Sequence, residues 1–228
     1  MTSSIELPEL GTDHATGLHY RLRAAHATPR ARLVLLHGVG GNETNLVGLI
    51  NHLPNDLELL FVRAPLQMGP QGYAWFQVSF TSEGPRINAP QAEASRHLLI
   101  QFVHNQTPLP TLIAGFSQGG IMSASVALSA PKEVAGFGLL SGRILPELKP
   151  AIATRNELQH LSAFVAHGRN DEKLPVAWAE RSREMLSALG VSCNYQVYDM
   201  AHEIVEAEIG DFVTWVEHIL SAPPQATS

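Results

Sequence analysis

The stretch from residue 111 to residue 120 constrains the fold of this chain more than any other. An apolar run leads into the pentapeptide Gly-Phe-Ser-Gln-Gly at 115–119, and a run of small and apolar residues follows it. This G-x-S-x-G pattern between a predicted strand and a predicted helix is typical of a sharp turn that exposes the hydroxyl of its serine, here Ser117. We expect Gly115 and Gly119 to keep side-chain bulk away from the point where strand and helix nearly touch. A chance match in a glycine-rich chain is the alternative, and the flanking strand and helix argue against it.

Apolar strands and helix-compatible segments alternate along the rest of the chain. Continuous apolar runs, such as residues 31–36, are typical of strands that are buried on both faces of a parallel sheet. The alternation predicts an α/β fold in which helices cover both faces of a mostly parallel central sheet. Strands are predicted at 18–25, 31–36, 57–62, 111–116, 134–140, 162–166 and 192–198, and helices at 43–53, 92–104, 118–130, 175–189 and 203–220.

Three segments are predicted to be peripheral or less regular. Residues 18–25 alternate loosely between apolar and polar side chains, which is typical of an edge strand. Residues 63–90 carry Pro and Gly repeatedly, and we expect an irregular excursion there. Residues 143–160 are expected to form a longer, mixed connection.

The length and composition fit one globular domain and exclude several classes of partner. The 228 residues suffice for a single domain over 1–228, with poorly ordered ends expected at 1–17 and 221–228. The formal net charge of -6, without a Lys/Arg cluster, argues against nucleic-acid binding. No apolar run approaches the length of a membrane span, and the single cysteine, Cys193, excludes an intramolecular disulfide. The first residues lack the basic and apolar regions of a signal peptide, so we expect a cytoplasmic location.

No pattern in the sequence predicts a metal site or a nucleotide cofactor. The pair His202-Glu203 lacks the second histidine of the zinc-binding motif H-E-x-x-H. The glycine-rich segment 37–41 lacks both G-x-G-x-x-G and the lysine of a phosphate-binding loop. We therefore expect no cofactor.

A serine hydroxyl is a poor nucleophile unless a neighbouring base takes its proton. Where serine lies in such a turn, the acid and then the histidine follow it along the chain. His202 comes just after the last predicted strand, where a loop would reach the serine, and is the predicted base. His218 lies in the final predicted helix and is expected to be a surface or packing residue. His160 and His167 precede every acid that we consider.

The acid must orient the imidazole and balance its positive charge. Asp171 follows the strand at 162–166 through a His-Gly turn and is the favoured candidate. Asp199 and Glu172 compete with it. Asp199 is close to His202 in sequence and is expected to stabilise its own loop, whereas Glu172 is expected to be a solvated charge.

A hydrolase also needs N–H donors for the negative charge that develops on the substrate oxygen. The main-chain N–H of Gln118, next to the serine, is the first candidate. The loop after the strand at 31–36 is expected to supply the second, and we choose the N–H of Val39 because neighbouring glycines let the backbone approach a substrate.

Taken together, these segments resemble the carboxylesterase/phospholipase family of α/β-hydrolases, the group that includes the acyl-protein thioesterases. The likeness extends over about residues 18–220, and the set of motifs in order is far more specific than any one of them. The matching segments are 36–40, 64–65, 72–76, 115–120, His167-Gly168-x-x-Asp171 with Pro175 following, and 200–203.

The resemblance implies an α/β-hydrolase fold with a minimal lid and a serine esterase that acts on short to medium acyl esters through an acyl-enzyme intermediate. Spacing alone predicts only a serine hydrolase. An acyl thioesterase or lysophospholipase is the runner-up, and a hydrolase-fold binding protein without catalysis is the alternative from another class. The expected partner is a small acyl ester. The oligomeric state is open, with a homodimer as one option.

The substrate pocket is the least constrained part of the site. Met68, Trp75 and Phe76 are candidates for the wall of an acyl pocket, with simple packing inside their loop as the alternative. The chain departs from the family pattern at 172–174, where the residues before the proline are usually more apolar, and at Ala201, where glycine is common. The first departure changes the rim of the pocket and so bears on substrate preference.

Overall fold

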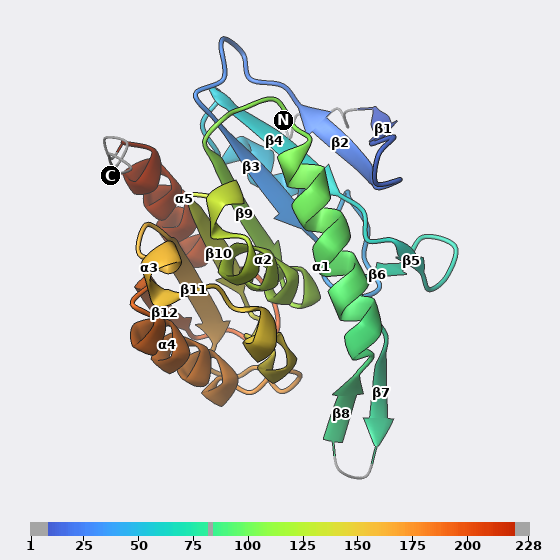
Figure 1. The fold of residues 1–228 in the computed structure, drawn as a ribbon, viewed down its shortest axis with the longest axis vertical. Coiled ribbons are helices and arrows are strands. Elements are labelled where there is room, and N and C mark those ends of the chain that lie inside the picture. The colour runs from blue at the N-terminus through green and yellow to red at the C-terminus, as the bar shows by residue number, and fades with distance from the viewer. Residues whose placement is uncertain (1–8, 82–83, 222–228) are drawn as a thin grey trace.

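The computed structural model describes residues 9–81 and 84–221 and is built on one eight-stranded sheet. The strands from β4 to the far edge at β12 run parallel, whereas β1 and β2 are antiparallel additions at the other edge. The prediction of a mostly parallel sheet is therefore confirmed (Figure 1). In spatial order the strands are β1 (Leu10–Thr12), β2 (His19–Arg23), β4 (Leu57–Val62), β3 (Ala31–Leu36), β9 (Thr111–Phe116), β10 (Gly136–Leu140), β11 (Ser162–Gly168) and β12 (Ser192–Tyr198).

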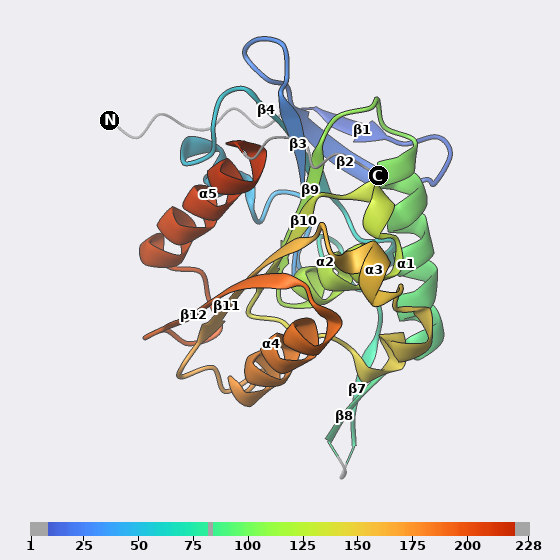
Figure 2. The same ribbon diagram turned by 60° about the vertical axis from the view of Figure 1, so that its left-hand side comes forward.

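Helices cover both faces of this sheet, as Figure 2 shows. Apolar side chains of α1 (Ala89–His104), α2 (Gln118–Ser129) and α4 (Ala177–Leu189) pack in one core with one set of strand residues. Side chains of α5 (Glu206–Ser221) and the 3-10 helix η1 (Val47–Asn51) pack in the core on the other face. Every residue of β3 is buried, as expected for a strand with a core on each side.

One prediction at the amino-terminal edge of the sheet is wrong, namely that residues 18–25 form an edge strand. Within 1–17, which were expected to be poorly ordered, residues 9–17 are described and contain β1; residues 1–8 lie outside the described part. Because β1 pairs with β2, β2 is not the edge strand that its sequence suggests. At the other end α5 includes Ser221, and the rest of 221–228 lies outside the described residues.

The predicted helix at 43–53 is also wrong, because only η1 forms there. Polar side chains bind the backbone just before it: Asn45 Oδ1 accepts from Asn42 N, and Asn42 Oδ1 accepts from Thr44 N. Such local hydrogen bonds compete with a helix for the same backbone groups. Their effect is to shape the loop that follows β3.

The two connections expected to be irregular contain short regular elements. Within 63–90, β5 (Leu66–Gln67) pairs with β6 (Tyr73–Ala74), and β7 (Val78–Thr81) pairs with β8 (Gly84–Ile87). Within 143–160, between β10 and β11, the 3-10 helix η3 (Pro146–Ala151) and the short helix α3 (Arg155–Leu158) form. Another 3-10 helix, η2 (Pro131–Glu133), lies just before β10.

Candidate active site

Ser117 lies at the tip of the turn between β9 and α2, in a backbone conformation that few side chains adopt. Its φ is 55° and its ψ is -116°. Positive φ is uncommon for a residue with a Cβ atom, and the surrounding structure must hold it. The Ser117 N–H donates to Leu140 O of the neighbouring strand at 2.7 Å, which helps to fix the turn.

The two glycines that flank the serine allow strand and helix to meet at this turn. A Cβ atom added to Gly115 would lie 2.3 Å from the carbonyl carbon of Gly119. A Cβ atom on Gly119 would lie 2.0 Å from Leu36 O on β3. Both distances are far below van der Waals contact, so the spacing predicted from the G-x-S-x-G pattern has a steric cause.

Ser117, His202 and Asp171 are brought together in one chain of hydrogen bonds. The Ser117 hydroxyl lies 2.9 Å from His202 Nε2, and His202 Nδ1 lies 2.6 Å from Asp171 Oδ2. Because a carboxylate only accepts, Nδ1 carries the proton and Nε2 is left to accept from the serine. The Asp171 side chain is fully buried and that of His202 is 10% exposed. Phe116 supports the imidazole, with ring centroids 4.9 Å apart.

The loops that carry His202 and Asp171 are joined along their backbones. Arg169 N donates to Tyr198 O at 2.9 Å, and Asn170 N donates to Met200 O at 3.0 Å. Gly168 permits this approach, since a Cβ atom there would lie 2.2 Å from Ala201 O. The distance between the imidazole and the carboxylate is thus set by backbone contacts as well as by the side chains.

His167 is a member of this site that the sequence analysis set aside. Its side chain is fully buried, and Nε2–H donates to Leu174 O at 2.7 Å while lying 3.4 Å from Asp171 Oδ2. The other carboxylate oxygen of Asp171 accepts from the N–H groups of Lys173 and Leu174 at 2.9 Å each. Burial lowers the pKa of His167, which keeps it neutral. The spacing H-G-x-x-D could have indicated this role.

The residues that compete for these roles lie elsewhere. Asp199 Oδ1 accepts from Asn170 Nδ2 at 2.8 Å, so it stabilises the joined loops, as predicted. Glu172 and His218 are exposed, and His160 Nε2 donates to Pro131 O at 2.8 Å.

The two predicted N–H donors come from separate elements that meet near the serine. Gln118 begins α2, where the first N–H groups of a helix have no helical acceptor. The loop with Val39 approaches from β3, and a Cβ atom on Gly38 would lie 3.3 Å from Ser117 Cβ. Neither N–H donates to any other described residue.

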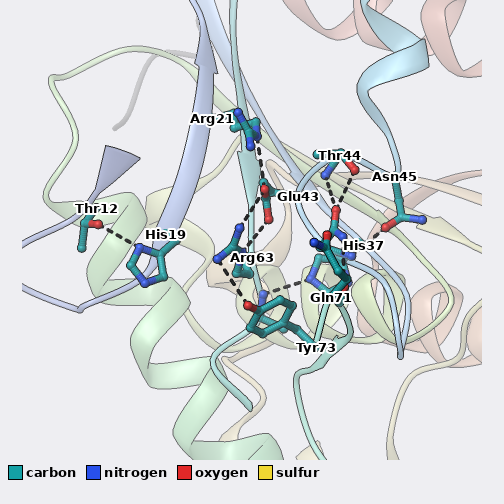
Figure 3. A network of polar contacts seen from close by, with 12 residues as sticks. Thr12, His19, Arg21, His37, Glu43, Thr44, Asn45, Arg63, Gln71 and Tyr73 are labelled. Carbon is teal, nitrogen blue, oxygen red and sulfur yellow. Dashed lines mark hydrogen bonds and ion pairs between the residues drawn. The ribbon is translucent and has the colours of Figure 1, made fainter. Parts of the chain in front are cut away.

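An ion-pair network is centred on Glu43, in the segment that follows β3 (Figure 3). Glu43 is buried and accepts from Arg63 Nε at 2.6 Å and from Arg21 Nε at 3.1 Å. Burial alone would raise the pKa of Glu43, but hydrogen bonds from Arg63, from its own backbone and from Arg21, together with the charge of Arg63, outweigh it and hold the pKa at about 2. Tyr73 connects Arg63 with the loop that carries Val39. Arg63 Nη1 donates to the Tyr73 hydroxyl at 3.4 Å, and Gly40 N donates to Tyr73 O at 2.8 Å.

Trp75 and Phe76 support the turn from inside the core instead of forming the wall of an open pocket. They are 0% and 1% exposed. The Gln118 side chain accepts from Trp75 N at 2.7 Å and donates to Phe76 O at 2.7 Å. Trp75 Nε1 also donates to His37 O at 2.9 Å. These two residues therefore pack inside the protein, which was the alternative to a pocket wall. Met68, the third candidate, is 51% exposed.

His37 shapes the same loop as a neutral residue. Its Nδ1–H donates to Gly38 O at 2.7 Å, and its Nε2 accepts from Ala64 N at 3.0 Å. Burial lowers the pKa of His37 to about 4, so the ring stays uncharged at neutral pH.

An open cleft adjoins the imidazole. Its volume is about 420 Å³, and it is lined by Val39, Gly40, Phe116, His202 and Ile204 among others. Within residues 9–81 and 84–221 there is no group of three or more side chains suited to a metal ion. No helix in that part of the chain is long and apolar enough to cross a membrane.

The fold and the turn at Ser117 define an α/β-hydrolase, and solved structures share this architecture. A carboxylesterase from Mesorhizobium loti is similar with a TM-score of 0.79 and 23% identity, covering 92% of this chain and 98% of that one. Acyl-protein thioesterase 2 from Zea mays has a TM-score of 0.74 and 21% identity, covering 89% and 99%. A family model described as phospholipase/carboxylesterase matches residues 19–220, and the chain belongs to this family.

Curated relatives are distant but extend over most of the chain. A probable inactive carboxylesterase of Oryza sativa subsp. japonica is 26% identical over 216 residues, covering 86% of this chain and 88% of the relative. Acyl-protein thioesterase 1 of Emericella nidulans is 25% identical over 221 residues, covering 84% and 91%. As a member of this family the chain is a hydrolase, as the sequence predicts.

The acid in the hydrogen-bond chain can be tested with two matched asparagine variants. Asp171→Asn should lower kcat by orders of magnitude, because an amide cannot balance an imidazolium; the same change in a Ser-His-Asp protease costs about 10⁴-fold. Asp199→Asn should cost much less, since its carboxylate bonds to Asn170 and not to His202. Steady-state kinetics with melting curves would measure both. A larger kcat loss in Asp199→Asn at unchanged stability would contradict the geometry.

Because of the buried ion pair of Glu43, the free energy of unfolding should fall as the pH is lowered through the acidic range. The contribution of this pair is fully present above the ordinary pKa of 4.5 and is lost as the pH falls toward about 2, because the folded state holds the ionised form. Glu43→Gln should therefore lower the free energy of unfolding at pH 7 by about 1–3 kcal/mol. The difference from wild type should shrink below pH 4.5.

Denaturant unfolding at several pH values would measure this difference. Glu184→Gln, which changes an exposed carboxylate on α4, serves as the control and should show little change at any pH. A Glu43→Gln variant as stable as wild type at pH 7 would contradict the account.

Proposed function

We propose that this protein is a serine esterase that hydrolyses carboxylic esters of short to medium acyl chains. The observation that carries the proposal is the hydrogen-bond chain from the Ser117 hydroxyl through His202 to the buried carboxylate of Asp171. Family membership supports it, because the matching family model is that of phospholipases and carboxylesterases. The proposal treats residues 1–228 as one domain and locates the protein in the cytoplasm.

Ser117 Oγ attacks the ester carbonyl carbon while His202 Nε2 takes its proton. Asp171 holds the ring with Nδ1–H toward itself and balances the positive charge that the ring gains. His202 then gives the proton to the leaving alcohol, and an acyl group remains on Ser117. A water molecule, deprotonated by the same nitrogen, attacks the acyl carbon; the bond to Ser117 Oγ breaks, His202 returns the proton to Oγ, and the acid is released. The reaction needs no metal or other cofactor.

Negative charge develops on the substrate oxygen when Ser117 attacks the ester and again when water attacks the acyl group. The N–H groups of Val39 and Gln118 are proposed to donate to it. Donors fixed before the reaction stabilise the transition state more than the substrate, and losing one such donor costs about 10²- to 10³-fold in kcat. The contacts of Tyr73, Trp75 and Glu43 support this role, because they fix the backbone on which the two N–H groups lie.

Two alternatives each have an observation in their favour. A relative named acyl-protein thioesterase 1 favours thioesters as substrates, and the same triad would serve, since thioester and ester carbonyls are attacked alike. A relative named as a probable inactive carboxylesterase favours a binding protein without catalysis. The intact hydrogen-bond chain argues against the second alternative here.

Replacing the nucleophile tests the proposal. Ser117→Ala should lower kcat for 4-nitrophenyl butyrate by at least about a thousand-fold, because no other described group completes the chain to His202. The fold should persist, since the change removes only one oxygen from the turn. Ser187→Ala, which changes an exposed serine on α4, is the matched control and should retain full activity.

A series of substrates would separate the alternatives. We expect kcat/KM to be highest for 4-nitrophenyl esters of short to medium chains and lower for acyl thioesters of the same length. A reversed order would replace the esterase by a thioesterase. A folded wild-type protein that hydrolyses neither class would contradict the proposal and favour a binding protein.

A further inference from the structure

A second cavity lies at the same edge of the sheet, between the segment after β10 and the start of α4. Its volume is about 160 Å³. Side chains from both elements line it, among them Arg143, Pro146, Trp178, Arg181 and Met185. Two cations and no carboxylate therefore face a space with otherwise largely apolar walls.

This cavity is next to the nucleophile along the backbone. Gly142 lies against the turn, since a Cβ atom there would be 3.0 Å from Ser117 O. Arg143 is the next residue, and neighbouring Cα atoms are about 3.8 Å apart. Trp178 begins the helix that follows the Asp171 loop. Arg143 therefore lines the cavity directly after a residue that packs against the turn of Ser117.

The guanidinium of Arg143 has a ring partner but no anion. It lies over the Trp178 ring, with Cζ 4.0 Å from the ring centroid. Within residues 9–81 and 84–221 it makes no ion pair with a carboxylate, although the charge of Glu147 acts on it. Burial lowers the pKa of Arg143, yet a guanidinium remains charged at neutral pH. A half-buried cation without a direct ion-pair partner is costly, and an anionic ligand would reduce that cost.

The geometry of this pair favours a flat anion. The Trp178 ring restricts the position of the guanidinium, and none of the described residues accepts a hydrogen bond from it. Arg181 lies one turn along α4 from Trp178, on the same face of the helix. It is exposed and forms no ion pair within the described part of the chain. A carboxylate matches the edge of a guanidinium with two parallel hydrogen bonds.

We propose that Arg143, Trp178 and Arg181 form an anion subsite that selects esters bearing a carboxylate a few atoms from the scissile bond. This inference rests on the proposed function, because the subsite serves the reaction at Ser117. It narrows the substrate class from acyl esters in general to esters with a negatively charged end. Glu147, on η3, limits the size of the effect because its charge opposes an anion near Arg143.

Two esters of equal chain length test the subsite. In 4-nitrophenyl hydrogen adipate the acyl chain ends in a carboxylate, and in 4-nitrophenyl hexanoate it ends in a methyl group. We expect wild type to have the higher kcat/KM for the adipate ester after correction for spontaneous hydrolysis. Arg143→Gln should lower the adipate-to-hexanoate ratio by about 10- to 100-fold, the range expected for charged hydrogen bonds. Arg181→Gln should lower the ratio less, because Arg181 is exposed.

Arg155→Gln is the matched control. Arg155 begins α3 and lies near Gly190 at the far end of α4, so the variant removes the same charge away from the cavity. Its ratio should equal that of wild type. An unchanged ratio in Arg143→Gln, or an equal fall in Arg155→Gln, would overturn the subsite while leaving the esterase proposal intact.

A binding measurement separates the subsite from catalysis. Adipic acid monoamide is an uncleavable analogue with one carboxylate, and hexanamide is its neutral counterpart. By isothermal titration, wild type should bind the monoamide more tightly than hexanamide, and Arg143→Gln should lose this preference. If neither ester is hydrolysed, the proposed function fails and this titration still decides the subsite. Equal affinity of wild type for both amides would overturn it.

Discussion

The close approach of α2 to β3 and β9 is the constraint on which the site depends. Gly119 lies against Leu36 O, and Gly115 lies against Gly119, so only hydrogen atoms fit at both positions. At this contact Ser117 takes a positive φ, and its hydroxyl lies within hydrogen-bond distance of His202 Nε2. Because the flanking elements are buried, the strain at the serine is stabilised by a large part of the fold.

The parallel sheet explains why distant segments meet at this turn. The carboxyl ends of parallel strands lie at one edge, so the loops after β3, β9, β11 and β12 reach the same place. Backbone hydrogen bonds then fix these loops to one another, as between Arg169 and Tyr198, or to a support such as Tyr73. The same edge carries the cavity beside Arg143, which connects the chemistry at Ser117 with the choice of substrate.

Features that depend on local constraints or on the order of segments along the chain could be predicted from the sequence. The turn at Ser117 was predictable because its glycines act within five residues, and the placing of His202 followed from the order of the loops. Trp75 and Phe76 stayed open between a pocket wall and simple packing, because their burial depends on the fold around them. The helix at 43–53 was wrong because the Asn42 and Asn45 side chains bind the backbone. The segment His167-Gly168-x-x-Asp171 was recognised, but the contact of His167 with Asp171 depends on how the loop folds.

The central claim is that Ser117 is activated by His202, and covalent labelling tests it most directly. A fluorophosphonate reacts with a serine whose proton a neighbouring base removes. After incubation with the folded protein, intact mass and peptide mapping should show a single adduct on Ser117, and His202→Ala should form it far more slowly. Labelling of another residue, or no labelling of a protein with a native melting curve, would contradict the account.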